Sequence, residues 1–171
     1  MIVIVFGLPG SGKSYFAQRL ADMLNAEYVN SDRLRKELFS IRTYSASEKA
    51  QVYKAMLNNM NKGIVQGRDL VLDATFHKNE SREMFAEKAG KEDLMFMEVQ
   101  ADEQIIRERL KKSRPYSEAD YNVYLQTKEQ WDPMSAPHLV LQSTNNNIDA
   151  MLQGAAKYLK DGKTRNRGLS F

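Results

Sequence analysis

The stretch Gly7–Ser14, GLPGSGKS, has the residue types and spacing of a loop that binds phosphate groups. It matches the pattern G-x-x-x-x-G-K-[ST] at every required position. Glycines let the backbone approach a polyphosphate closely, and a helix that follows turns its positive end toward the same anion. We expect Lys13 to contact the β and γ phosphates and the Ser14 hydroxyl to bind Mg²⁺.

The neighbours of this loop are those that the motif requires. A continuous apolar run over 2–6 predicts a buried strand before it, and a helix is predicted from about 13 to 24 after it. The chain contains no Asn-Lys-x-Asp sequence of the kind that reads guanine. We therefore predict ATP as the nucleotide, with contacts from Gly7, Leu8, Pro9, Gly10, Ser11, Gly12, Lys13, Ser14 and Tyr15.

Two charged residues follow the second predicted strand, 27–29, in the sequence NSDRLRKEL. Asp32 and Arg35 are three residues apart and share one face of a helix start. A carboxylate here can accept the proton of an attacking hydroxyl, and an arginine one turn later can hold an anionic substrate. The alternative is structural, with Asp32 as an ordinary helix cap and Arg35 as surface charge.

The third predicted strand, 69–74, ends in a second group of polar residues, VLDATFHKNESR. Asp73 can hold Mg²⁺ through water or orient the loop serine, and Thr75 can add a ligand or a cap. His77 has no ligand partner at metal spacing, which favours a surface or substrate-side position. Asn79 and Arg82 fit a helix cap and its first turn.

Further along the chain, Arg107, Lys111 and Arg114 form one basic stripe that ends at a proline-containing break. Two helices joined by a basic hinge predict a lid that closes over the phosphates, with Arg114 at the hinge. The alternative is a solvated charged face. After the fifth predicted strand, the segment 142–147, QSTNNN, either contacts the base or forms an ordinary turn and cap.

The apolar pattern alternates short strands with helices, which predicts an α/β fold with a five-stranded parallel sheet covered on both faces and a helical lid. Ligands of such sheets bind beyond the carboxyl ends of the strands, where the candidate residues lie. The expected strands are 2–6, 27–29, 69–74, 94–99 and 138–143. The expected helices are 13–24, one from about 31, 45–65, 79–89, 102–112, one from 117 to before 132, and 148–159.

Composition limits the classes of protein that fit this chain of 171 residues. It contains no cysteine, which excludes disulfides and thiolate chemistry, and no apolar run long enough for a membrane span. Absence of an export signal favours a cytoplasmic protein. Of 25 basic and 22 acidic residues, four and one lie in 160–171, so residues 1–159 are neutral overall. We expect a kinase domain over 1–159 and a basic, solvated tail over 160–171.

Over roughly residues 1–145, these motifs resemble small P-loop kinases of the AAA_33-like "predicted kinase" group. That group is similar to the kinase domain of phage polynucleotide kinase and more distantly to zeta toxins and shikimate or gluconate kinases. The resemblance implies that Asp32 is the general base, Arg35 the acceptor-phosphate clamp, Asp73 a metal-side or substrate-side acid and Arg114 the lid arginine. No phosphatase domain follows, so a combined end-healing role has no support.

Three functions fit these observations. The favoured one is transfer of the ATP γ-phosphate to a polynucleotide or nucleoside 5′-hydroxyl, which suits Arg35 and the basic tail. The neutral body instead suits a second, a kinase of a small polar metabolite, sugar or antibiotic. The third is a non-catalytic module that binds ATP as a sensor, in which Asp32 and the lid would have no purpose.

Overall fold

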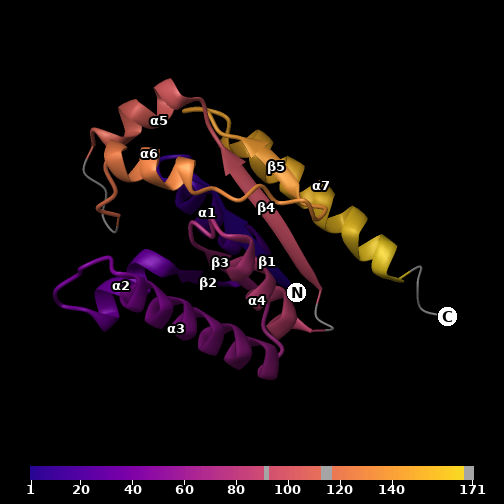
Figure 1. Cartoon of the computed structure of the whole chain (residues 1–171). Helices are drawn as coiled ribbons and strands as arrows, with labels where there is room; N and C mark the ends of the chain where they lie inside the picture. The colour runs from indigo at the N-terminus through magenta and orange to yellow at the C-terminus, as the bar shows by residue number, and fades with distance from the viewer. Residues whose placement is uncertain (91–92, 113–116, 168–171) are drawn as a thin grey trace.

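A computed structural model describes residues 1–90, 93–112 and 117–167, with side chains to 162. Five parallel strands form one sheet, as predicted, and their order in it is β2-β3-β1-β4-β5 (Figure 1). Within the described ranges, the strands are β1 (Ile2–Phe6), β2 (Glu27–Asn30), β3 (Leu70–Asp73), β4 (Leu94–Gln100) and β5 (Leu139–Gln142).

Helices cover both faces of this sheet (Figure 1). Side chains of β1 alternate between the two faces, so Ile2, Ile4 and Phe6 enter one core and Val3 and Val5 the other. The first core contains α3 and α4, and the second contains α1 and α7. The helices are α1 (Lys13–Leu24), α2 (Ser31–Leu38), α3 (Ala46–Val65), α4 (Asn79–Ala89), α5 (Glu103–Leu110), α6 (Tyr121–Glu129) and α7 (Ile148–Arg167).

The strand order creates the binding edge. The chain passes from central β1 to β2 and β3 on one side, and then to β4 and β5 on the other. Such a reversal opens a crevice at the carboxyl ends of the strands. The phosphate loop leaves β1 there, and α5 and α6 lie above the same edge (Figure 1).

The last helix continues beyond the predicted limit at residue 159. It reaches Arg167, so residues 160–167 belong to α7 rather than to a separate tail. Leu159 is buried, and a Cβ added to Gly162 would lie 2.5 Å from Met95 Cε. Close packing on β4 therefore extends past residue 159. In the described part of the chain, no helix is both long enough and apolar enough to cross a membrane.

Arg82 lies in the first turn of α4, as predicted, and is buried, whereas the residue at the cap position is Lys78 rather than Asn79. The Arg82 guanidinium donates hydrogen bonds to the carbonyls of Phe76 (2.7 Å) and Asp132 (2.5 Å) and to the Asn79 side chain. The same group lies over the rings of Phe6 and Trp131. Arg82 thus ties the segment after β3 to the segment after α6.

Candidate active site

The loop between β1 and α1 has the strained backbone that its glycines predict. Gly12 caps α1 in a left-handed conformation, with φ of 95°. A Cβ added to Gly12 would lie 2.8 Å from Ser143 Oγ, and one on Gly7 would lie 2.3 Å from the Val99 carbonyl. Side chains at these positions would collide with the ends of β4 and β5, so the sequence needs glycine here.

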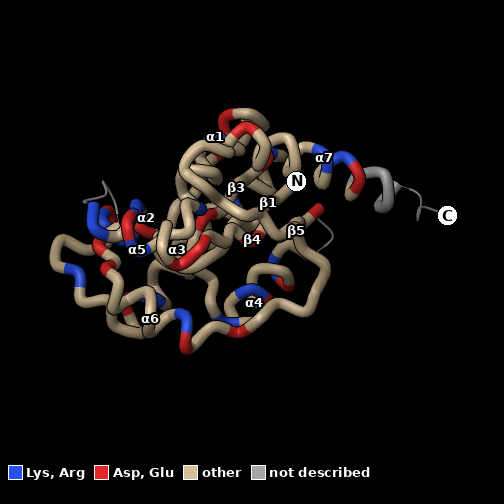
Figure 2. The backbone as a smooth tube through the Cα atoms, turned by 90° about the horizontal axis from the view of Figure 1, so that it is seen from above, with Lys and Arg blue, Asp and Glu red and all other residues tan. Residues whose placement is uncertain are grey.

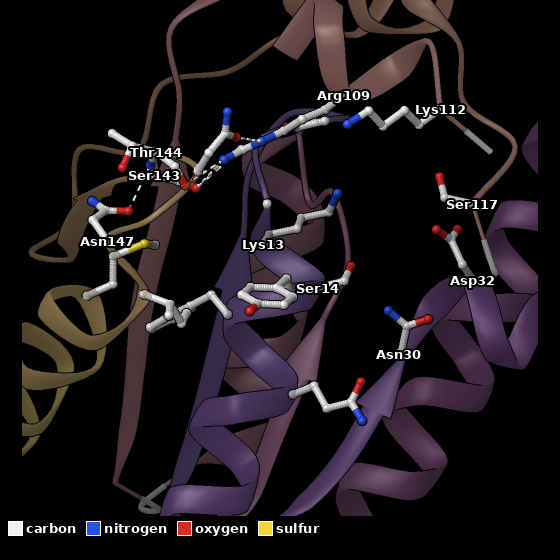
Figure 3. A pocket seen from close by; sticks show the side chains of 18 of the residues that line it. Lys13, Ser14, Asn30, Asp32, Arg109, Lys112, Ser117, Ser143, Thr144 and Asn147 are labelled. Carbon is white, nitrogen blue, oxygen red and sulfur yellow. Dashed lines mark hydrogen bonds between the residues drawn. The ribbon is translucent and has the colours of Figure 1, made fainter. Parts of the chain in front are cut away.

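A cavity of about 590 Å³ opens above this loop, in the range of small-ligand sites. Lys13 and Ser14 lie at its centre, with the Ser143–Asn147 loop on one side and Asp32 on the other (Figure 3). The lining includes five predicted nucleotide contacts: Gly10, Gly12, Lys13, Ser14 and Tyr15. Predicted polar contacts from the Gln142–Asn147 segment are also present, through Ser143, Thr144, Asn145 and Asn147.

The remaining predicted loop contacts do not line this cavity. Gly7 and Pro9 are buried. Leu8 and Ser11 line a second cavity, of about 480 Å³, beneath α5 and α6. The Thr75 carbonyl accepts a hydrogen bond of 3.5 Å from the Gly7 amide, so Thr75 supports the start of the loop.

Asp32 lies at the end of the cavity farthest from the Thr144–Asn147 loop, beside Ser117 (Figure 3). It stands in the first turn of α2, but the helix is capped by Asn30, whose side chain accepts a hydrogen bond from the Arg33 amide at 2.9 Å. The capping alternative for Asp32 is therefore not what the structure shows. Arg114, the predicted lid arginine, lies outside the described residues.

Asp73 is completely buried at the carboxyl end of β3, next to β1. Its Oδ2 accepts hydrogen bonds from the Tyr28 hydroxyl (2.7 Å) and the Asn30 amide (2.6 Å). Burial, together with the negative charge of Asp73, raises the pKa of Tyr28, so the tyrosine stays protonated and keeps donating. No described residue donates a hydrogen bond to Asp73 Oδ1, which is also buried.

This donor set fits Mg²⁺. Mg²⁺ prefers oxygen ligands, and two are available here: Asp73 Oδ1, which accepts no hydrogen bond from any described residue, and the Ser14 hydroxyl. Nucleotide phosphates usually complete such sites. Within the described ranges, no group of three or more His, Cys, Asp or Glu residues could hold a metal by itself. A Mg²⁺ site built on Ser14 and Asp73 would therefore need further ligands from the nucleotide.

Arg35 does not point into the cavity as an isolated clamp. Its Nη1 forms an ion pair of 2.5 Å with Glu48 Oε1, and its guanidinium lies 4.8 Å from the centre of the Tyr44 ring. Glu48 also accepts hydrogen bonds from the amides of Thr43 (2.6 Å) and Tyr44 (3.1 Å). Burial opposes ionisation of Glu48, but these hydrogen bonds and Arg35 lower its pKa to about 2. Arg35 therefore joins α2 to the start of α3.

Arg109 is among the cavity residues that the sequence analysis missed. From α5, it donates hydrogen bonds to the carbonyls of Ser11 (2.9 Å) and Thr144 (2.7 Å) and to Ser143 Oγ (3.2 Å) (Figure 3). Arg109 thus connects the phosphate loop to the loop after β5 through hydrogen bonds. The spacing contains a signal for it, because Arg109 is three residues after buried Ile106 and shares its inward face.

We predict that Arg109→Met raises the KM for ATP roughly tenfold to hundredfold, since two charge-assisted hydrogen bonds to loop carbonyls are lost. Steady-state kinetics with varied ATP would measure the change. Arg107→Met is the matched control, because Arg107 is on the same helix but exposed, bonded to Tyr121. An equal rise in both variants would contradict a role for the Arg109 hydrogen bonds.

The two described residues of the predicted basic stripe lie on the surface. Arg107 and Lys111 are exposed, and Lys111 pairs with Glu108 at 2.6 Å. Glu118, which precedes α6, contacts the α2–α3 loop: it accepts hydrogen bonds from Arg42 Nη2 (2.7 Å) and the Tyr44 hydroxyl (2.6 Å). These contacts connect the segment before α6 to the α2–α3 loop.

A central P-loop, a parallel sheet of this order and a helical segment above its carboxyl edge define the fold of P-loop kinases. The chain belongs to the AAA_33 family, described as an AAA domain, whose model matches residues 2–136. None of the three relatives described next is a polynucleotide kinase.

Three relatives illustrate the likeness. A probable gluconokinase of Dictyostelium discoideum is 20% identical over 173 residues, covering 94% of this chain and 86% of that protein. The structure of a gluconokinase from Sinorhizobium meliloti 1021 has a TM-score of 0.76 at 16% identity, over 99% of this chain and 97% of the other. That of the Mycobacterium tuberculosis APS kinase with AMPPNP and APS has a TM-score of 0.69 at 19% identity, over 93% and 96%.

Proposed function

We propose that this protein is an ATP-dependent kinase that transfers the γ-phosphate to a hydroxyl of a small polar metabolite of the sugar or sugar-acid class. The observation that carries the proposal is the placement of Lys13 and Asp32 in one cavity (Figure 3). Lys13 belongs to a phosphate loop, and Asp32 is a carboxylate at the far end, where an acceptor can approach. A module that only bound ATP would have no use for that second end.

The reaction needs one bond formed and one broken. The acceptor oxygen forms a bond to the γ-phosphorus, the bond from that phosphorus to the β,γ-bridging oxygen breaks, and ADP leaves. Asp32 accepts the hydroxyl proton, while Lys13 and the loop amides stabilise charge on the phosphoryl oxygens. When bound, Mg²⁺ neutralises phosphate charge; Ser14 and Asp73 would hold it. Tyr28 and Asn30 keep Asp73 oriented.

The adenosine part of ATP is assigned to the end of the cavity that the acceptor does not occupy. Asp32 occupies the acceptor end, so the adenosine part is placed toward Ser143, Thr144 and Asn147, beyond Lys13 (Figure 3). Arg109 holds that wall to the phosphate loop. Ser117 lines the acceptor end beside Asp32, where a closing segment would limit access of water during transfer (Figure 3).

The acceptor class is the point on which we depart from the sequence-based preference for a 5′-hydroxyl of a nucleic acid. The relatives named above are gluconokinases and an APS kinase, which favours the small-metabolite alternative. Charge placement agrees, since basic and acidic positions are interspersed around α2, α5 and α6 (Figure 2). A nucleic-acid binder would more often carry a basic track.

The test is transfer of labelled γ-phosphate from ATP to a panel of acceptors: sugar acids, neutral sugars, adenosine 5′-phosphosulfate, nucleosides and 5′-hydroxyl oligonucleotides. We expect one class of small metabolite to accept phosphate well above the rate of ATP hydrolysis. Transfer to oligonucleotides, with a KM that rises steeply with salt, would replace the proposal by the polynucleotide reading. Tight ATP binding without transfer to any acceptor would favour the sensor reading.

A further inference from the structure

A second polar group lies at the carboxyl edge of the sheet, where α3 begins and beyond the end of β3. Lys49 is in the first turn of α3, and His77 is in the segment between β3 and α4. Lys49 Nζ lies 3.2 Å from His77 Nδ1 and 3.4 Å from Nε2. Both side chains are partly buried. The assigned contacts of ATP and of the general base leave this pair unused.

The position of Lys49 is unfavourable in the protein alone. A lysine in the first turn of a helix faces the positive end of the helix dipole. Burial lowers the pKa of Lys49, and the nearby charges of Arg35 and Lys78 lower it further. Among the described residues, no carboxylate forms an ion pair with Lys49, whereas Arg35 pairs with Glu48 and Lys78 with Asp132. The local electrostatics therefore favour an added negative charge.

His77 cannot supply that charge. Burial, followed by the charges of Lys49 and Lys78, lowers the pKa of His77 to about 4, so the ring is neutral at pH 7. A neutral imidazole can still donate one hydrogen bond and accept another. Lys49 and His77 together thus offer a cation and a neutral donor, as a compact oxyanion requires.

The backbone before His77 is held in a strained conformation that presents this ring. Phe76 has φ of 45°, which is unusual for a bulky residue, and is fully buried. Its amide donates to the Tyr53 hydroxyl at 3.3 Å, and its carbonyl accepts from Arg82 at 2.7 Å. The amide of Asp132 bonds the His77 carbonyl at 2.8 Å. Strain that is held this firmly is typical of functional sites.

The pair is connected to the acceptor side of the active site through α2, although neither residue lines the cavity. Arg35, one turn after Asp32 on α2, forms an ion pair of 2.5 Å with Glu48, the residue before Lys49. The N-terminal part of α3 lies beside α2 at the carboxyl edge of the sheet (Figure 1). An anionic group on a molecule whose hydroxyl approaches Asp32 could therefore reach this pair.

We propose that Lys49 and His77 bind an oxyanion, a carboxylate or a phosphate, on the acceptor, so that the substrate is an anionic polyhydroxy compound. The inference rests on the proposed function for the identity of the ligand as an acceptor. A neutral sugar would bring no negative charge to Lys49.

The test uses the two histidines of the chain, His77 and His138, whose ring signals can be titrated separately by NMR. A non-hydrolysable ATP analogue is kept saturating so that added anions do not enter the phosphate loop. The probes are D-gluconate, uncharged D-glucitol and inorganic phosphate. An anion beside His77 stabilises its protonated form, so we expect gluconate or phosphate to raise the pKa of His77 but not of His138, and glucitol to do neither.

The variant Lys49→Met is expected to weaken binding of the effective anion about tenfold or more, because a charge-assisted hydrogen bond is lost. Removing this poorly placed charge should also raise the thermal midpoint of the ligand-free protein by roughly 2–4 °C. Lys54→Met is the matched control, since Lys54 is exposed on the same helix, and it should change neither value. A lowered midpoint with lost binding would instead identify Lys49 as a structural residue.

Binding and transfer are read separately, so the two proposals can fail independently. An unmoved His77 signal with every probe would overturn the anion site, even if a neutral sugar proves to be a good acceptor. A response that is equal for gluconate and glucitol would do the same. If an anion shifts His77 but no acceptor in the panel receives phosphate, the proposed kinase function fails while the anion site stands.

Discussion

Lys13→Met is expected to lower kcat/KM for phosphoryl transfer by about 10³-fold, the size of effect seen when one donor to a developing charge is removed. The Lys13 side chain lies in the centre of the cavity, between Asp32 and the Ser143–Asn147 loop that we assign to adenosine (Figure 3). Its ammonium group is placed to stabilise the negative charge that develops on the γ-phosphate and on the leaving oxygen of ADP. The loop amides remain in the variant, so ATP binding should weaken less than transfer.

Steady-state kinetics and an equilibrium titration with ATP would separate these two effects for Lys13→Met. Methionine has a similar length and helix propensity, so α1 should still form and the thermal midpoint should change little. Lys54→Met, which removes a lysine from the exposed face of α3, is the control and should keep full activity. Transfer by Lys13→Met within about tenfold of the unaltered rate would exclude the proposed use of the loop.

The sheet and the phosphate loop were predictable because their signals are local. A short apolar run followed by a glycine-rich loop and a helix allows few structures, and β1 with Gly7–Ser14 forms as predicted. The position of Asp73 at the end of β3 also followed from the run of apolar residues before it. In each case, neighbours in the sequence determine the environment of the residue.

The contacts of arginine were not predictable in the same way. Arg35, Arg82 and Arg109 all bind partners that lie far away in the sequence, at Glu48, Asp132 and Ser11. A long side chain with a planar donor group can reach several elements, and only the packed fold decides which of them. The sequence analysis thus pointed to Arg107, Lys111 and Arg114, whereas the arginine of α5 that contacts the phosphate loop is Arg109.

The hydrogen bonds that orient Asp73 illustrate a similar limit. Tyr28 and Asn30 lie on β2, and they reach Asp73 only because β2 pairs with β3 in a register that places Asn30 opposite Asp73. Strand order cannot be read from the spacing of apolar residues. The sequence therefore suggested Asp73 as an acid for a metal site, but it could not show that Tyr28 and Asn30 both bind the same oxygen of Asp73.

Asp32→Asn is expected to lower kcat for transfer to the preferred acceptor by about 10³-fold, the usual contribution of a general base. The amide has nearly the same shape as the carboxylate but cannot accept the hydroxyl proton. Asn30, and not Asp32, supplies the side-chain cap of α2, so the helix should persist. ATP affinity should also persist, since Asp32 lies at the opposite end of the cavity from the Ser143–Asn147 loop (Figure 3).

A pH profile distinguishes a base from a residue that only positions the acceptor. A carboxylate base works in its ionised form, so kcat/KM of the unaltered protein should fall at acidic pH as the base becomes protonated. In Asp32→Asn, that acidic limb should disappear along with most of the rate. Asp22→Asn, an exposed change on α1, should keep both the rate and the limb. If Asp32→Asn transfers phosphate at the unaltered rate, a different group must take the proton, and the acceptor end of the cavity would have to be reassigned.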